Sequence, residues 1–492
     1  MRLAHMLCAA LSWPLLAARV LATPPPLPAE HLTVERLPPR SPHWVYVFDY
    51  MFDNEIDARV YLYDGDSYRR LGQIGAGFYS SLNLSPDGGT TAVASTYFAR
   101  GSRGARTDVV EFTDNATLTV THEILLPSKR ALSALGLFNL SYSADGHLLY
   151  AAYMTPAASF GVLDPAAGTV LGEVDTAGCV LVIPSGHYRV SSLCESGRVL
   201  TVTLDAQGHE LARAMSEPFF DADQDPVFVQ GIPTTRGNVY LSFLGEVHQI
   251  DFSAAPPEFA APWSLVSPAE KGHWRPGAYQ VGAVHRELGR LYVPMHEGGE
   301  GTHKDGGTEI WVYDLASHRR LARWPLKMHG LSRVTAVQVS QDPAPILFAA
   351  TETSDLAVFD ALTGRLRHIT KRVAQSPWML LNPSRHGVHA AQTRSVVRTF
   401  HPLAGAAHLA PESAGVTRTA AHRRGAPAVT ADGSRRPRTR RRSQAAGCRS
   451  RRLPVLEILR DRWLPVLLLW RHFRLLPSGH GALADLLDRD LS

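Results

Sequence analysis

Short apolar runs that end in an aspartate recur along the chain. The clearest copy is Glu309–Leu326, EIWVYDLASHRRLARWPL, in which the apolar run Ile310–Tyr313 ends in an acid and a polar turn leads to a second run. This pattern predicts a strand, a tight turn and a returning strand. Seven copies are present, and their strand-end acids are Asp64, Asp114, Asp164, Asp205, Asp251, Asp314 and Asp360.

The spacing of the seven acids indicates the fold. Consecutive acids are 50, 50, 41, 46, 63 and 46 residues apart. Repeats of this length, with several strands each, are typical of propeller blades. We therefore predict an all-β, seven-bladed β-propeller. Because aspartate accepts hydrogen bonds from the backbone two residues on, we interpret the seven acids as turn residues and not as catalysts.

The two ends of the repeat region predict how the ring closes. HWVYVFDY (His43–Tyr50) reads as a strand that precedes the first copy, and the final copy, from Leu356 to Pro383, supplies only part of a blade. We expect the early strand to complete that final blade, because a closed ring leaves no exposed sheet edge.

Charge divides the chain into two parts. Residues 385–492 contain 20 Arg, no Lys and 7 acidic residues, a formal charge of +13, so the rest of the chain carries −8 of the total of +5. The predicted propeller is therefore acidic, and the C-terminal segment is strongly basic.

The N-terminus resembles a secretory signal. Arg2 precedes an apolar run that ends near Val20, and small residues stand at the positions that signal peptidase reads, which predicts cleavage after Ala22. A membrane anchor is the alternative, although the run is short for one. The expected organisation is a signal peptide (1–22), a flexible arm (23–42), a propeller (43–384) and an Arg-rich tail (385–492). We expect a periplasmic location.

Two cysteines lie in the predicted propeller, Cys179 and Cys194. The segment between them reads as two strands around Pro-Ser-Gly, so the thiols can face each other across a hairpin. An even pair in an oxidising compartment favours a disulfide. Two separate buried thiols are the alternative.

Few other residues point to chemistry. The loop Thr96–Asp108 carries Arg100, Arg103 and Arg106, which suits either an acidic partner or an ordinary solvated loop. His296 and His303 lie in a Gly-rich segment without a convincing third ligand, so we expect no metal site. No nucleophile elbow, HExxH motif or dinucleotide fingerprint occurs. We therefore expect no catalytic residue in this chain.

Several longer segments carry a family resemblance. Between Leu32 and Pro383 the chain resembles the heavy subunit of the bacterial quinoprotein amine dehydrogenases, which act on methylamine or on aralkylamines. The lead-in LPAEHLTVERLP and the segment PFFDADQDPVF look more like the aralkylamine branch. The main resemblance rests on RGARTDVVEF, GCVLVIPSG with SSLCESG, EVHQIDFS, HWRPGAYQVGAVHRELGRLYV and QSPWMLLNP.

The resemblance implies a function shared with a partner. It implies a periplasmic tetramer of two heavy and two light chains, in which the light chain carries tryptophan tryptophylquinone and the catalytic base. A primary amine would become an aldehyde and ammonia, and an azurin or amicyanin-type copper protein would accept the electrons. The resemblance assigns a substrate-channel role to Phe78, which follows Gly77, and a weaker one to its neighbour Tyr79. The alternative for Phe78 is a core aromatic. The family resemblance also implies a disulfide between Cys179 and Cys194.

The C-terminal segment departs from this family, whose heavy chain ends soon after the last strand. This segment has three possible interpretations: a nucleic-acid or membrane-binding arm, a helical extension, or a reading-frame error in a GC-rich gene. We favour the frame error, because Arg without any Lys is unusual for a selected basic patch, and we expect no nucleic-acid partner. Residues 422–452 have no apolar periodicity and read as disordered.

Two other classes of function compete with the amine dehydrogenase subunit. One is a periplasmic propeller that acts as a binding or scaffold module without a quinone partner. The other is a self-sufficient propeller enzyme such as a lactonase, which would need a metal or acid–base cluster that these residues do not supply. A neighbouring gene for a small, Cys-rich, Trp-containing secreted chain would favour the amine dehydrogenase subunit over the scaffold module.

The frame-error hypothesis makes a direct prediction about the gene. Resequencing the codons for Pro383–Phe400 should reveal an inserted or deleted base, after which the corrected frame ends soon after the last strand. An intact frame across these codons would remove the hypothesis.

Overall fold

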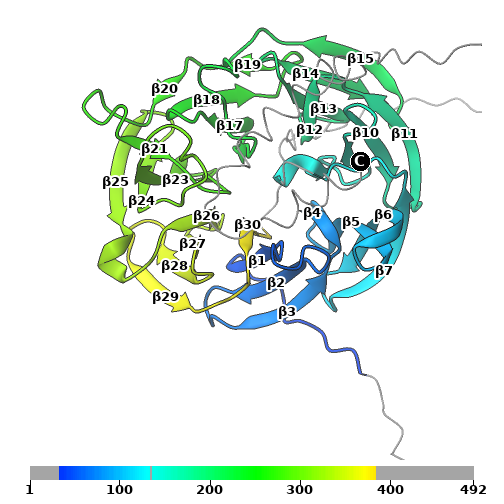
Figure 1. Cartoon of the computed structure of the whole chain (residues 1–492), viewed down its shortest axis with the longest axis horizontal. Coiled ribbons are helices and arrows are strands. Elements are labelled where there is room, and N and C mark those ends of the chain that lie inside the picture. The colour runs from blue at the N-terminus through cyan, green and yellow to red at the C-terminus, as the bar shows by residue number, and fades with distance from the viewer. Residues whose placement is uncertain (1–32, 133–135, 384–492) are drawn as a thin grey trace, which may run out of the picture. The chain divides into compact units, whose positions relative to one another are not determined.

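The computed structural model describes residues 33–132 and 136–383 of the chain. These residues form 30 strands and two short 3-10 helices, η1 (Leu137–Asn139) and η2 (Leu326–His329). The strands build seven antiparallel sheets of four or five strands, arranged as a ring of blades around a central axis (Figure 1). The predicted seven-bladed β-propeller is confirmed.

Three blades follow each other in the first half of the chain, each with its first strand nearest the axis. The first contains β4 (Phe78–Leu84), β5 (Thr90–Arg100), β6 (Arg103–Asp114) and β7 (Thr119–Leu126). The second contains β8 (Leu140–Tyr142), β9 (Leu149–Tyr153), β10 (Ser159–Asp164) and β11 (Thr169–Asp175). The third contains β12 (Cys179–Pro184), β13 (Arg189–Cys194), β14 (Val199–Leu204) and β15 (Glu210–Met215).

Three further blades follow, two of which are irregular. The next contains β16 (Ile232–Pro233), β17 (Gly237–Leu241), β18 (Glu246–Asp251), β19 (Glu258–Phe259) and β20 (Trp263–Ser264). Its neighbour has a divided inner strand and contains β21 (Trp274–Pro276), β22 (Ala283–His285), β23 (Arg290–Glu297), β24 (Glu309–Asp314) and β25 (Arg319–Pro325). The last contains β26 (Val334–Val339), β27 (Ile346–Thr351), β28 (Leu356–Asp360) and β29 (Leu366–Thr370).

The seventh blade joins the two ends of the described chain. Its strands are β30 (Pro377–Leu381) on the inside, followed by β1 (Trp44–Asp49), β2 (Arg59–Asp64) and β3 (Arg70–Gly75). The early strand β1 pairs with β30 in antiparallel register, which closes the ring as expected. The final repeat is divided between two blades, however, because β1 joins only its last strand, β30, whereas β28 and β29 belong to a complete blade of their own.

The burial of the strands explains the apolar runs of the sequence repeat. The second strands β1, β9 and β27 are buried at every position, whereas the outer strands β3 and β15 are mostly exposed or half-buried. Continuous apolar runs are the pattern of strands covered on both faces. The sequence repeat therefore marks the step from a buried third strand to the exposed outer strand of each blade.

The seven strand-end acids act as turn residues, as predicted. Each follows or ends the third strand of a blade. The side-chain Oδ1 atom accepts a hydrogen bond from the backbone N–H two residues on in six of them, for example from Ala116 to Asp114 at 2.8 Å. In the seventh, Asp314 accepts from the N–H of Ser317 at 2.7 Å.

Most of the predicted terminal segments fall outside the described residues. The signal cleavage after Ala22, the first half of the arm and the whole Arg-rich tail lie there. In the described part of the arm, the Leu37 N–H donates to the Ala116 carbonyl at 2.8 Å. Among residues 33–132 and 136–383 no helix has the length and apolar character needed to cross a bilayer.

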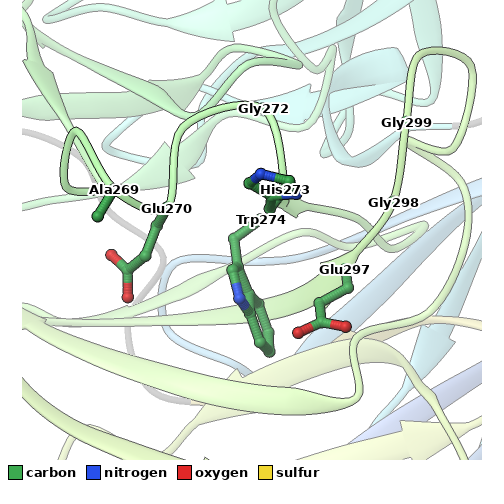
Figure 2. A pocket seen from close by; sticks show the side chains of 8 residues that line it. All are labelled: Ala269, Glu270, Gly272, His273, Trp274, Glu297, Gly298 and Gly299. Atoms are coloured by element: carbon green, nitrogen blue, oxygen red, sulfur yellow. The ribbon is translucent and has the colours of Figure 1, made fainter.

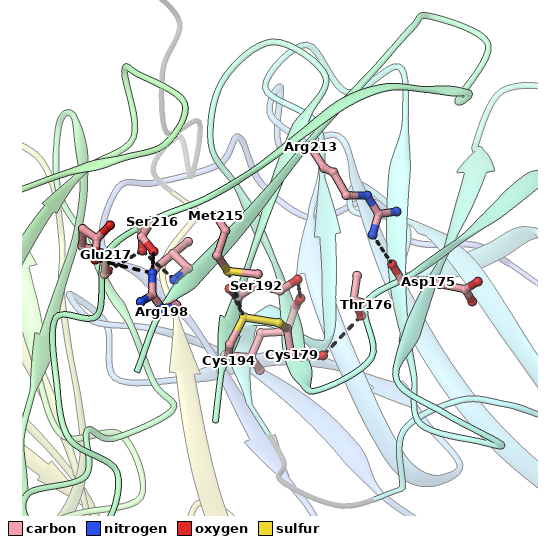
Figure 3. The surroundings of a disulfide bond; sticks show 12 residues. Asp175, Thr176, Cys179, Ser192, Cys194, Arg198, Arg213, Met215, Ser216 and Glu217 are labelled. Carbon is pink, nitrogen blue, oxygen red and sulfur yellow. Dashed lines mark hydrogen bonds and ion pairs between the residues drawn. A yellow bond between two sulfur atoms is a disulfide. The ribbon is translucent and has the colours of Figure 1, made fainter. Parts of the chain in front are cut away.

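The predicted disulfide is present. Cys179 on β12 and Cys194 on β13 lie directly opposite each other in the hairpin register and are joined through their sulfur atoms across 15 residues of sequence. The bridge is buried beside Met215 of the outer strand β15 (Figure 3). It therefore ties the inner edge of this blade together.

Removing the bridge tests its contribution to stability. Closing a loop of about 15 residues restricts the unfolded chain and contributes roughly 3 kcal/mol. We expect the Cys179→Ser, Cys194→Ser double variant to unfold at a lower urea concentration than the oxidised wild type. A reducing agent should lower the wild-type midpoint to that of the variant and leave the variant unchanged. Equal midpoints for oxidised and reduced wild type would contradict this prediction.

Candidate functional site

The blade geometry assigns the candidate residues to one face of the ring. Neighbouring strands in each blade are antiparallel, so the first and third strands run in the same direction. The aspartate turns follow the third strands and define one face. Phe78 is the first residue of the inner strand β4, so Phe78 and Tyr79 lie toward the opposite face, at the axis end of their blade.

The backbone at this point is irregular. The pairing of β4 with β5 shifts register between Phe78 and Ser81, and Tyr79 adopts a left-handed conformation with φ 45°. Such a conformation costs a non-glycine residue about 1–2 kcal/mol. A Cβ atom on Gly77 would lie 2.7 Å from the Thr96 carbonyl oxygen, so only glycine fits before the bulge. The bulge directs two consecutive aromatic residues to this end of the strand.

A buried guanidinium lies beneath the bulge. Nη1 of Arg130 donates to the Tyr79 carbonyl at 2.7 Å, and Nη2 donates to the Phe78 carbonyl at 2.8 Å. Arg130 also donates to Oγ1 of Thr96, from Nη2 at 2.8 Å and from Nε at 3.2 Å. Arg130 is only 3% exposed, and burial lowers its pKa to about 10, so it remains a cation at neutral pH.

One buried carboxylate, that of Asp108, lies beside Arg106 and Arg130. Arg106 binds Asp108 in a bidentate geometry, with Nε–Oδ1 and Nη2–Oδ2 distances of 2.9 and 2.7 Å. Asp108 also accepts hydrogen bonds from the Thr96 hydroxyl at 2.7 Å and from the Arg130 backbone N–H at 3.2 Å. Asp108 therefore binds the guanidinium of Arg106 directly, and the hydroxyl of Thr96 links Asp108 to the guanidinium of Arg130.

The three arginines of the predicted loop have different environments. β5 and β6 form a long hairpin, and Arg106, which is bound to Asp108, pairs with Phe98 in the half of the hairpin that includes the tip. Arg100 and Arg103 are exposed at its tip. The part of the hairpin that extends beyond β4 starts at the candidate site, because Thr96 pairs with Phe78 and the Phe98 ring lies 6.0 Å from the Phe78 ring.

Further aromatic residues gather at the same end of the closing blade. Tyr50 follows β1, and its ring lies 5.9 Å from that of Trp378 at the start of β30. Phe52 and Tyr279 also contact Trp378, with centroid distances of 4.9 and 3.7 Å. Both the Tyr50 hydroxyl and the Trp378 Nε1 are buried and have no hydrogen-bond partner within the described part of the chain. Sequence reasoning did not single out this cluster, because its members come from distant segments.

The ionisation of these groups limits what they can do. Burial raises the pKa of Tyr79 to about 12 and also raises the pKa of Tyr50, which the charge of Arg130 opposes in part. Both phenols are therefore protonated at neutral pH. The site offers a rigid aromatic wall and hydrogen-bond donors, and neither phenol is poised to act as a base.

The two histidines considered as metal ligands have structural surroundings. His296 is fully buried, and its Nε2 lies 3.0 Å from the Thr302 hydroxyl. Burial lowers its pKa to about 4, so the ring is neutral. The His303 ring stacks on Phe243 at 4.0 Å. In residues 33–132 and 136–383, no group of three or more His, Cys, Asp or Glu side chains has a geometry suited to a metal ion.

A separate pocket opens beside β21, with a volume of about 520 Å³. Figure 2 shows the Trp274 ring between the carboxylates of Glu270 and Glu297. Glu270 binds Arg320 at 2.9 Å and Arg323 at 3.4 Å. Burial alone would raise the pKa of Glu270, but the hydrogen bonds from Arg320 and Ser267 outweigh it and lower the pKa to about 2. Glu270 is therefore ionised and paired, and it connects the segment before β21 to Arg320 and Arg323 of the outer strand β25.

The seven blades place the chain among the β-propeller proteins. The model of the methylamine dehydrogenase heavy chain family matches residues 42–382, so the chain belongs to this family of amine dehydrogenase heavy chains.

The relatives share modest sequence identity with the chain. The methylamine dehydrogenase heavy chain of Methylophilus methylotrophus is 27% identical over 341 residues, which cover 68% of this chain and 82% of that protein. The heavy chain of Methylobacillus flagellatus is 26% identical over 356 residues, 72% of this chain and 88% of that protein. A solved dihydro-heme d1 dehydrogenase, NirN, is similar with a TM-score of 0.46 at 15% identity, over 72% of this chain and 78% of that one.

The ion pairs of Glu270 predict a loss of stability in acid. The pKa of Glu270 is lower in the folded protein than its ordinary value of 4.5, so its contribution is complete above about pH 4.5 and is lost as the pH falls toward 2. We expect this contribution to be roughly 1–3 kcal/mol after allowance for solvent screening.

The test compares two pocket variants. Urea midpoints are measured at pH 7 and pH 3 for the wild type, Glu270→Gln and Glu297→Gln. Glu270→Gln should lower the pH 7 midpoint and reduce the drop toward pH 3, whereas Glu297→Gln, a change at an exposed residue of the same pocket, should behave like the wild type. Identical pH dependence in all three proteins would refute the assignment.

Proposed function

We propose that the chain is the heavy subunit of a periplasmic amine dehydrogenase, which docks a light chain that carries tryptophan tryptophylquinone. The match of the family model to residues 42–382 is the observation that supports this most directly. The proposed complex contains two heavy and two light chains. It oxidises a primary amine to an aldehyde and ammonia and passes the electrons to an azurin or amicyanin-type copper protein.

In the proposed complex, the aromatic residues of this chain line the substrate channel, and the light chain carries the cofactor. The quinone supplies the electron-accepting carbonyl when the light chain is bound, and a reactive quinone needs a dry, shaped cavity. Phe78 and Tyr79 lie on the bulge of β4 and present aromatic surface, and Tyr79 adds one protonated hydroxyl. We assign to them the shaping of the substrate channel.

For the amine, we propose an aralkylamine as the preferred substrate. LPAEHLTVERLP and PFFDADQDPVF support this branch, and so does the aromatic character of the site, because offset aromatic pairs are worth about 0.5–1.5 kcal/mol beyond the area they bury. The relatives named above are methylamine dehydrogenase heavy chains, so methylamine is the comparison that the assay must include.

Purification from the native periplasm tests the assignment. The chain is recovered from cells that express its whole gene cluster, and the co-eluting proteins are run on a quinone-staining gel. We expect a small quinone-positive chain in equimolar amount, a mature N-terminus at Thr23, and amine oxidation with an artificial electron acceptor. A colourless propeller that elutes alone would favour the scaffold interpretation instead.

A variant of the channel residue tests the substrate class. Phe78→Ala should lower kcat/KM for 2-phenylethylamine relative to methylamine by up to about tenfold, the equivalent of one lost aromatic contact. The control is Phe359→Leu, a conservative change in the core of the β26–β29 blade, which should leave the ratio unchanged. An unchanged ratio in Phe78→Ala would assign Phe78 to the core and not to the channel.

A further inference from the structure

We propose that Arg130 is a positioning residue, which fixes the aromatic pair Phe78–Tyr79 at the channel and thereby contributes to amine selectivity. This inference rests on the proposed function of the same site. Arg130 lies on the segment between β7 and η1, 34 residues from Thr96 and more than 50 from Phe78. Nothing in the repeat pattern distinguishes it.

The bulge removes part of the support that a regular strand would have. The β4–β5 register passes from Phe78 directly to Ser81, so Tyr79 and Ser80 have no paired residue on β5. Ser80 is tied locally, since its hydroxyl donates to the Gly77 carbonyl at 2.6 Å and lies 3.1 Å from the Ser95 hydroxyl. The carbonyls of Phe78 and Tyr79 instead accept hydrogen bonds from Arg130. The guanidinium thus replaces strand-pairing hydrogen bonds that the bulge removes between β4 and β5.

The chemistry of this contact requires arginine. The planar fork directs one nitrogen to each of two consecutive carbonyls and two nitrogens to the Thr96 hydroxyl, all in one fixed geometry. The ammonium of lysine carries its donors on a single atom, so it cannot reproduce bonds that leave from two separate nitrogens. A lysine at this position would keep the positive charge and lose the geometry.

The charges around Arg130 make the arrangement rigid. Asp108 is its nearest acid, but the oxygens of Asp108 are occupied by Arg106, by the Thr96 hydroxyl and by the Arg130 backbone N–H. The Arg130 side chain therefore directs its donors to carbonyls and a hydroxyl. Because a buried charge without such partners is costly, the guanidinium and the two carbonyls hold each other in place. The left-handed conformation of Tyr79 is maintained by this contact.

The experiment compares two lysine substitutions in the same network. Arg130→Lys removes the fork beneath the aromatic pair. Arg106→Lys is the matched control, because Arg106 contacts Asp108 and the Arg130 carbonyl and makes no hydrogen bond to Phe78 or Tyr79. Thr96→Val is a second variant, which removes the hydroxyl that aligns Arg130 and preserves all charges. Each variant is purified as the complex with its light chain.

Two readouts separate positioning from general stability. The first is hydrogen exchange of the amides in residues 77–81, which we expect to accelerate about tenfold or more in Arg130→Lys, as the loss of hydrogen bonds to a charged group implies. The second is the ratio of kcat/KM for 2-phenylethylamine and methylamine. This ratio should fall at least about threefold through KM in Arg130→Lys, and Thr96→Val should change it in the same direction.

The outcomes distinguish this inference from the proposed function. If Arg106→Lys changes exchange and selectivity as much as Arg130→Lys does, or if Arg130→Lys changes neither, Arg130 is a structural residue and the proposal fails. If Arg130→Lys does not fold, Thr96→Val decides by the same criteria. If the wild-type complex oxidises no amine, the proposed function fails, and with it the selectivity role. Exchange in residues 77–81 still decides whether Arg130 positions the bulge.

Discussion

The pairing of β1 with β30 is the constraint on which the rest of the propeller depends. At its end, the fully buried Asp49 accepts hydrogen bonds from the backbone N–H groups of Gln375 and Ser376, at 2.7 and 2.8 Å, more than 320 residues along the chain. At the other end, Asn382 donates to the carbonyls of Pro42 and Trp44. A buried carboxylate bonded in this way loses its compensation if the strands separate, so the junction keeps the ring closed and holds the inner strands at fixed positions around the axis.

The sequence predicted the local turns of this fold and the closure of the ring, and it missed how some inner strands are arranged. Each aspartate turn joins strands that are adjacent in the chain, so its signal lies within about ten residues. The pairing of β30 with β1 from the far end of the chain was expected because a ring must close, but the repeat pattern did not show that β28 and β29 belong to a different blade from β30. The divided inner strand β21–β22 was missed for a related reason, because its two short pieces leave too few residues to form a pattern.

The same division applies to the candidate site. Gly77, Phe78 and Tyr79 were found through a family resemblance, and the bulge gives a physical reason for the glycine. Arg130 contacts Asp108 and the bulge only in the folded chain, and a single Arg in a mixed segment carries no signal of burial. The cluster around Trp378 was missed likewise. The face with the aspartate turns repeats one turn seven times. The face with Phe78 and Tyr79 varies from blade to blade, as expected where function determines the loops.

Ring closure also determines the order of events during biosynthesis. Because β30 is among the last described segments to be made, six blades can assemble from contiguous stretches while the seventh still lacks its inner strand. Until then the edge of β1 is open, and an unpaired strand edge invites association with other chains. The nascent protein is thus vulnerable until its final strand arrives, and a chain truncated before Pro377 would remain in that state permanently.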